Sequence, residues 1–78
     1  MSKKHKLLLL SVFDFITEFI DKNKYTPSYD EISEGLQMSI AYISKLVSEL
    51  VDIGLLERPR NRALIKGKLD RDEWLKDI

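Results

Sequence analysis

The sequence contains no cysteine and only one histidine, His5. Disulfides and thiolate metal sites are therefore excluded, and a histidine-based metal site or catalytic dyad has too few members. No nucleophile and base stand at a plausible spacing elsewhere, so we expect no enzyme and assign no catalytic residue, metal ligand or cofactor. With 78 residues, the chain has room for one domain with one small core.

A long apolar run is also missing. A basic start with Lys3, Lys4 and Lys6 leads into the short apolar run Leu7–Leu10, which superficially resembles a signal peptide. Asp14 interrupts the apolar stretch soon afterwards, no small-residue cleavage site follows, and the run is far shorter than a bilayer span. We therefore expect a cytoplasmic protein without a membrane segment.

An excess of charge is absent as well, because 13 basic residues balance 13 acidic ones. A net charge of zero at first argues against a nucleic-acid partner, but the distribution of charge matters more than its sum. Basic residues crowd the N-terminus and a later stretch: Lys3, Lys4, Lys6, Arg58, Arg60, Arg62, Lys66 and Lys68. Acidic residues gather in the first half and in the tail. This pattern fits a module with one basic and one acidic face, although such charges can also merely solubilise a small domain.

What the sequence does have is helical periodicity. Apolar residues recur at intervals of three or four from about Leu7 to Asn23 and predict a helix. Its buried stripe is expected to contain Leu9, Val12, Phe13, Ile16 and Ile20. A second apolar flank, formed by Leu8, Phe15 and Phe19, lies beside that stripe. We expect the flank to pack under the tail or against a second subunit.

A second helix is predicted from Ser28 to about Leu36. Glu31 stands three residues after Ser28, and the two side chains complete a capping box that satisfies otherwise unpaired amide hydrogens. Ile32 belongs to its buried side. Gly35, near the end of the helix, is expected to provide the tight turn into the next one.

The third predicted helix is the one around which the other elements are arranged. Ser39 is its expected N-cap, and Gly54 is its expected C-terminal stop. One side is apolar at helical spacing, with Ile43, Leu46, Val47 and Leu50, extended by Ile53. The other side carries small and hydrogen-bonding residues, which are Ala41, Ser44, Lys45 and Ser48, with Tyr42 at the boundary.

A basic hairpin is predicted to follow the third helix. Two short strands, Leu55–Arg58 and Ala63–Lys66, flank a turn that contains Pro59, Arg60 and Arg62. An isolated two-stranded hairpin is only marginally stable in water, so the hairpin must pack against the helices. After it, the tail is expected to form a short helix that presents Trp74, Leu75 and Ile78.

Together these elements predict a mainly α domain with a small β-hairpin. The order is that of a winged helix-turn-helix, with a three-helix core, a wing and a short C-terminal helix. We divide the chain into a basic N-terminal leader (1–6), the winged helix-turn-helix domain (7–68) and a C-terminal tail (69–78).

Four segments resemble the N-terminal DNA-binding domain of LexA-type repressors and, more broadly, bacterial and phage winged helix-turn-helix regulators. They are TPSYDEIS at 26–33, LQMS at 36–39, LVSEL at 46–50 and GLLE at 54–57. The resemblance implies a regulator of transcription, expected to be a repressor, that binds double-stranded DNA. We expect a chain of this length to lack the protease and dimerisation domain of those repressors, so no cleavage-controlled switch is implied. The exposed residues of the third helix differ from theirs, so no operator sequence carries over.

In that fold, the second helix of the turn lies in the major groove with its N-terminal residues toward the bases. The resemblance therefore implies that DNA is bound by Ser39, Ile40, Ala41, Tyr42, Ser44, Lys45 and Ser48. The wing would place Arg58, Arg60 and Arg62 over the backbone or in a narrow minor groove. Plainer interpretations exist: Lys45 as a solvated charge, Tyr42 as a core residue, and the serines and arginines as ordinary surface.

One module of this size buries little DNA surface, so two copies are expected to pair on a repeated or palindromic site. The candidate contact for a homodimer consists of Leu8, Phe15, Phe19 and Trp74. The competing hypothesis is a winged-helix module for protein–protein interaction or assembly without specific DNA binding, which zero net charge and an acidic tail would suit. Three arginines in five residues favour nucleic acid, because a protein-docking wing has no need of them.

Overall fold

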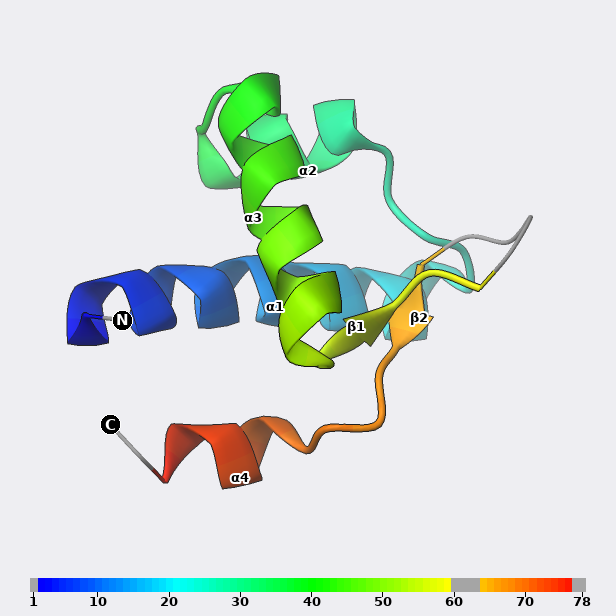
Figure 1. Ribbon diagram of the computed structural model, residues 1–78. Coiled ribbons are helices and arrows are strands. Elements are labelled where there is room, and N and C mark those ends of the chain that lie inside the picture. Colours follow the sequence, from blue (N-terminus) through cyan, green and yellow to red (C-terminus); the bar gives the residue numbers. More distant parts are fainter. Residues whose placement is uncertain (1, 60–63, 77–78) are drawn as a thin grey trace.

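The computed structural model describes residues 2–59 and 64–76. In this part of the chain the elements are α1 (Lys3–Asn23), α2 (Tyr29–Leu36), α3 (Ile40–Ile53), β1 (Leu56–Glu57), β2 (Ile65–Lys66) and α4 (Arg71–Leu75). α2 and α3 pack on one side of α1, the hairpin extends from the C-terminal end of α3, and α4 runs back along α1 (Figure 1). The predicted fold class, mainly α with a small β-hairpin and a short C-terminal helix, is confirmed.

α1 begins at Lys3 rather than at the predicted Leu7, so most of the expected basic leader is helical. Ser2 caps it, and its hydroxyl accepts a hydrogen bond from the amide of His5 at 3.2 Å. The Nε2 atom of His5 lies 2.7 Å from a carboxylate oxygen of Glu49 on α3, 44 residues away in sequence. The predicted start was wrong because it relied on the apolar periodicity, which begins only at Leu7. The Ser2 cap and the contact of His5 with Glu49 stabilise the helical turn that precedes Leu7.

α2 begins with the predicted capping box. The amide of Glu31 donates to Ser28 Oγ at 3.1 Å, and the amide of Ser28 donates to Glu31 Oε1 at 3.0 Å. Gly35, however, lies inside the helix and not in the turn. A Cβ atom at this position would clash with the ring of Phe15, so Gly35 allows α1 and α2 to approach closely. The turn instead uses Gln37, which has a left-handed φ of 55°.

α3 is capped at both ends as predicted. The hydroxyl of Ser39 accepts a hydrogen bond from the amide of Tyr42 at 3.2 Å. Gly54 ends the helix with a φ of 102°, a conformation that glycine adopts without the steric cost of a Cβ. The predicted apolar side is confirmed, because the residues completely buried on α3 are Ile43, Leu46, Val47 and Leu50.

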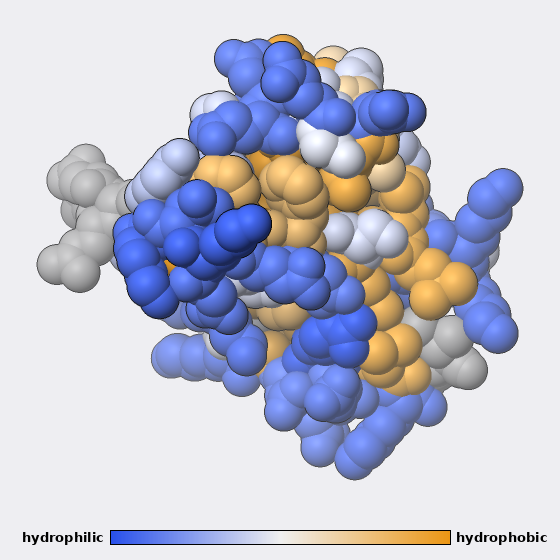
Figure 2. Space-filling view, turned by 180° about the vertical axis from the view of Figure 1, so that it is seen from behind, coloured by the Kyte–Doolittle hydropathy of each residue, from blue (hydrophilic) through white to orange (hydrophobic). Residues whose placement is uncertain are grey.

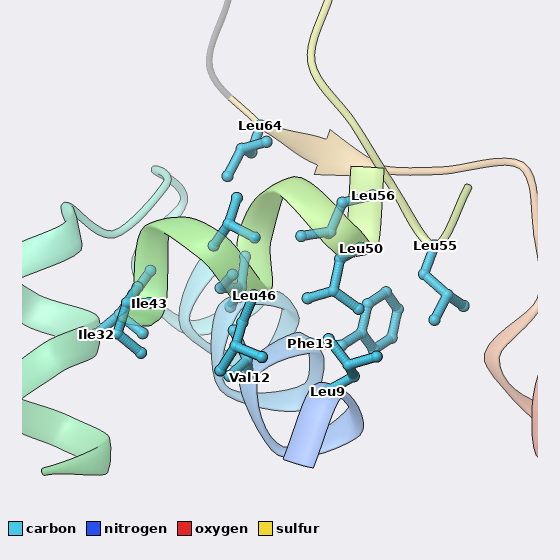
Figure 3. Packing of buried hydrophobic residues seen from close by; sticks show 12 residues of the cluster. Leu9, Val12, Phe13, Ile32, Ile43, Leu46, Leu50, Leu55, Leu56 and Leu64 are labelled. Atoms are coloured by element: carbon cyan, nitrogen blue, oxygen red, sulfur yellow. The ribbon is translucent and has the colours of Figure 1, made fainter. Parts of the chain in front are cut away.

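One apolar cluster joins the three long helices to the hairpin. Its members are Leu9, Val12, Phe13, Ile16, Ile32, Ile43, Leu46, Val47, Leu50, Leu55, Leu56 and Leu64. Figure 3 shows α1 and α3 facing each other across it, with Leu56 and Leu64 closing the hairpin side. Full burial of a leucine contributes about 1.5–3 kcal/mol. These two leucines therefore anchor a hairpin that would be marginal alone.

The hairpin is short and antiparallel, with Leu56 of β1 opposite Lys66 of β2. It is also tied to the connection between α1 and α2, because the hydroxyl of Thr26 donates to the carbonyl of Leu64 at 3.0 Å. The connection and the hairpin consequently lie next to each other (Figure 1). This contact fixes the position of the hairpin relative to the start of α2.

α4 is fastened to α1 by polar and apolar contacts. Arg71 donates from Nε to Asp14 Oδ1 at 2.7 Å and from Nη2 to Asp14 Oδ2 at 2.8 Å. These hydrogen bonds to Asp14 raise the pKa of Arg71 above its ordinary value. The Nζ atom of Lys6 lies 5.2 Å from the centroid of the Trp74 ring. Leu10, one helical turn from both Lys6 and Asp14, is buried.

The residues predicted for a dimer contact face two different flanks of α1. Phe15 meets Gly35 of α2, and Phe19 stacks on Phe15 with ring centroids 6.2 Å apart. Leu8, seven residues before Phe15, shares that flank and also packs against the core. Viewed from behind, apolar residues form a band between α2 and α1 (Figure 2). Trp74 instead belongs to α4, on the opposite flank, so the four residues do not form one surface.

Candidate nucleic-acid interface

The side of α3 that faces away from the core consists of the residues predicted to bind DNA. Ser44 is half-buried, and the exposed residues are Ser39, Ile40, Ala41, Tyr42, Lys45 and Ser48. Ile40 is 46% exposed and Tyr42 is 38% exposed. Tyr42 is therefore not a core residue, which removes the plainer interpretation of its side chain.

Four exposed residues of α3 follow one another at intervals of three or four, and so form one stripe: Ala41, Lys45, Ser48 and Asp52. Lys45 makes no ion pair with any residue in 2–59 or 64–76. Its charge is thus available to a partner. Asp52 was not anticipated as part of this surface, and its carboxylate limits how close an anion can come to the C-terminal end of the stripe.

Tyr42 lies on a separate flank of α3, beside the start of α1. It lines a hollow of about 360 Å³ together with Ser2, Lys4, His5 and Leu8. Lys4 is exposed at this edge. The predicted basic leader therefore contributes a lysine next to the third helix, although as part of α1 and not as a free arm.

Arg58 follows β1 directly and connects the hairpin to both helices of the turn. Its Nη2 atom donates to the hydroxyl of Tyr29, the first residue of α2, at 2.6 Å. Arg58 also lines a hollow of about 120 Å³ with Ser48, Val51 and Asp52 of α3. The end of β1 and the exposed stripe of α3 thus lie on the same side of the molecule.

Tyr29 contacts Arg58, but nothing in the sequence indicated this role. It lies within the 26–33 segment, where the capping box of α2 was the only visible signal. Its ring packs partly against the core, and its hydroxyl meets an arginine 29 residues later in the chain. The remaining predicted wing residues, Arg60 and Arg62, lie outside the described residues.

The expected division into one basic and one acidic face is only approximate. Lys6 lies over Trp74 and Arg71 pairs with Asp14, so these basic residues serve the attachment of α4. Asp52, in contrast, stands within the α3 stripe. In the described part of this face, Lys45 and Arg58 supply positive charge and Asp52 supplies negative charge.

Other kinds of site are not evident in the part of the chain that the structure describes. Within residues 2–59 and 64–76, no group of three or more His, Asp or Glu side chains is arranged to hold a metal ion. None of the helices there has both the length and the apolar character needed to cross a bilayer.

Comparison with known proteins yields one informative similarity. No protein-family model matches the chain. The chain is 42% identical over 53 residues to the LexA repressor of Koribacter versatilis (strain Ellin345). The matched stretch is 67% of this chain and 25% of that repressor, so the chain spans about a quarter of the length of the curated relative it matches. The similarity agrees with the resemblance noted in the sequence segments.

Proposed function

We propose that this chain is a winged helix-turn-helix module that binds double-stranded DNA sequence-specifically and represses transcription. The observation that carries the proposal is the hollow shared by Ser48 of α3 and Arg58, the residue that directly follows β1 of the hairpin. A helix and a wing can grip one duplex only if both project toward the same side. The similarity to a LexA repressor supports a DNA partner. A DNA-binding role would place the protein in the cytoplasm.

The side of α3 that faces away from the core has the chemistry to read base edges in the major groove. Ile40 and Ala41 can contact a thymine methyl group, and Lys45 can donate to the acceptor edge of a guanine or to a phosphate. Ser39, Ser44 and Ser48 carry hydroxyls that can reach phosphates or base edges. Tyr42, on its separate flank, is placed to donate to a phosphate beside the groove.

The hairpin would supply the contacts that are independent of base sequence. Arg58, Arg60 and Arg62 can bind phosphates or enter a narrow minor groove. Each phosphate contact releases condensed counterions, which increases affinity and makes it depend on salt concentration. Because the net charge of the chain is zero, these few local charges would have to supply most of the electrostatic attraction.

The test begins with selection of the preferred duplex from a random pool, followed by fluorescence anisotropy across a salt series. We expect Arg60→Ala with Arg62→Ala to weaken binding to all duplexes and to lower the salt slope by about 2, roughly 0.9 for each lost phosphate contact. Lys45→Ala should instead reduce discrimination between the selected duplex and its single-base variants.

Lys76→Ala is the matched control, because it removes one exposed basic residue from the end of α4. It should leave affinity and salt slope nearly unchanged. The proposal fails if wild-type protein binds no duplex at low salt. If binding persists while the wing and Lys45 variants behave like the control, DNA binding stands but the assigned face is wrong.

Pairing of two copies on a palindromic site is a further part of the proposal. Phe15 and Trp74 are used within the chain and face opposite flanks of α1, so they do not support a common dimer contact. Sedimentation equilibrium at high concentration, with and without the selected duplex, measures the assembly. A monomeric mass under both conditions would rule the homodimer out.

A further inference from the structure

Arg58 is held in place by a group that carries no charge. The Tyr29 hydroxyl accepts from its Nη2 atom at 2.6 Å, and no carboxylate of residues 2–59 or 64–76 lies within ion-pair distance of Arg58. A guanidinium has five N–H donors, of which this contact uses one. The phenol can therefore orient the arginine without neutralising it, and leaves donors for an external acceptor.

The surroundings define what that acceptor can be. Arg58 is exposed and shares its hollow with the exposed hydroxyl donor of Ser48. Tyr29 is a firm support, because its ring packs on the core and its backbone starts α2 directly after the N-cap Ser28, within the capping box. A fixed guanidinium next to a hydroxyl suits a tetrahedral oxyanion, which arginine binds in a bidentate manner.

We propose that Tyr29 is a positioning residue that holds Arg58 beside Ser48, so that together they bind one backbone phosphate of a DNA duplex. This inference rests on the proposed DNA-binding function and adds two things to it. It assigns a role to Tyr29, and it makes Arg58 a phosphate contact with a fixed orientation directly after β1. Asp52 lines the same hollow, so its charge should weaken the binding of the phosphate.

The first measurement is a double-mutant cycle on affinity for the selected duplex. We expect Arg58→Ala to weaken binding about tenfold, the loss expected for one charge-assisted hydrogen bond. Tyr29→Phe keeps the ring and removes only the hydroxyl, so it should weaken binding about threefold. The double variant should bind no more weakly than Arg58→Ala alone, because Tyr29 acts through Arg58.

The second measurement locates the phosphate. Duplexes in which a single phosphate is replaced by an uncharged methylphosphonate are compared one position at a time. At one position the replacement should weaken wild-type binding and have little further effect on Arg58→Ala or Tyr29→Phe. Arg58→Lys provides a second variant at this position. It keeps the positive charge but loses the planar guanidinium, which can donate hydrogen bonds to Tyr29 and to a phosphate at the same time.

Tyr25→Phe is the matched control. Tyr25 is 56% exposed, and its ring packs edge-on against Phe19 at 5.3 Å between centroids. Tyr25 lines a different hollow from the one shared by Arg58 and Ser48, so the control should bind every duplex like wild type. Thermal unfolding of all variants separates effects on folding from effects on binding.

The possible failures are distinguishable. If wild-type protein binds the duplex but Tyr29→Phe binds equally well, or if its effect adds to that of Arg58→Ala, the positioning role is wrong and the proposed function stands. A methylphosphonate scan without any position specific to Arg58 would likewise overturn the phosphate subsite. If wild-type protein binds no duplex at low salt, the proposed function fails and the inference fails with it.

Discussion

Two arginines at the surface of this small domain are held in opposite ways. Arg71 at the start of α4 is gripped through two hydrogen bonds by the carboxylate of Asp14, at 2.7 and 2.8 Å. Arg58 at the end of β1 is held by the neutral hydroxyl of Tyr29 at 2.6 Å. The carboxylate cancels the charge of its arginine, whereas the phenol preserves it.

The difference indicates which arginine attaches one element of the chain to another and which is available to bind DNA. The Asp14–Arg71 pair joins α1 and α4. Its opposite charges largely cancel, so it exerts little electrostatic attraction on a partner. Arg58 has a fixed orientation, and its positive charge is not neutralised by a carboxylate of the described residues. It lies beside the exposed stripe of α3. The partner of an arginine, and not its exposure alone, therefore indicates which basic residues are available to DNA. The following predictions test that contrast.

The largest expected effect concerns the attachment of α4. Trp74→Ala should lower the free energy of unfolding by about 2 kcal/mol, because a partly buried tryptophan gives less than the roughly 3–5 kcal/mol of a fully buried one. Urea denaturation measures this loss. Under conditions where the variant is folded, its DNA affinity should match wild type, and a clear drop would place α4 in the interface.

The comparison is sharpest when each arginine is replaced in turn. Arg58→Ala should reduce DNA affinity about tenfold and lower the salt slope by roughly 0.9, while Arg71→Ala should leave the slope unchanged. Anisotropy titrations of both variants over the same salt series provide the measurement. Equal slopes for the two variants would abolish the proposed distinction.

The Asp14–Arg71 pair should contribute to stability and not to binding. Its side chains are 37% and 35% exposed, so solvent screening limits the coupling to about 1 kcal/mol despite the two-point geometry. A double-mutant cycle with Asp14→Ala and Arg71→Ala, followed by urea denaturation, measures that coupling. It should shrink at high salt. A coupling of zero at low salt would mean that the apolar contacts alone hold α4.

The smallest effect is expected at Asp52. Asp52→Asn removes the negative charge that shares the hollow with Arg58, so DNA affinity at low salt should rise about two- to threefold. Glu18→Gln is the matched control, because it makes the same change in net charge at an exposed position of α1. If both variants bind DNA equally well, the increase in affinity reflects the change in net charge and not the removal of a carboxylate from the hollow beside Arg58.

Some parts of the fold and site could be predicted because their partners are close in sequence. Ser28 and Glu31 form their capping box over three residues, and Ser39 reaches an amide three residues later. The exposed stripe of α3 follows from helical spacing alone. Three of its four residues, Ala41, Lys45 and Ser48, were therefore predicted correctly as surface, although their contact with DNA stays a prediction.

Other features depended on residues that are distant in sequence. Gly35 was expected to form a turn, but its role is to admit the ring of Phe15 from α1. Tyr29 was not singled out, because nothing near it in the chain indicates that Arg58 will approach its hydroxyl. Periodicity and capping rules describe one helix at a time, so they carry no information about such encounters.

By itself, the sequence determined where α2 and α3 begin, which sides of the long helices are apolar, and that a basic hairpin follows Gly54. Only the tertiary structure decided that Arg58, at the end of β1, shares a hollow with Ser48 of α3, and that one arginine is neutralised while the other is left charged. The physical reason is range. Caps and periodicity arise within one or two turns of chain, whereas the partners of Arg58 and Arg71 lie 29 and 57 residues away and meet only after the core has formed.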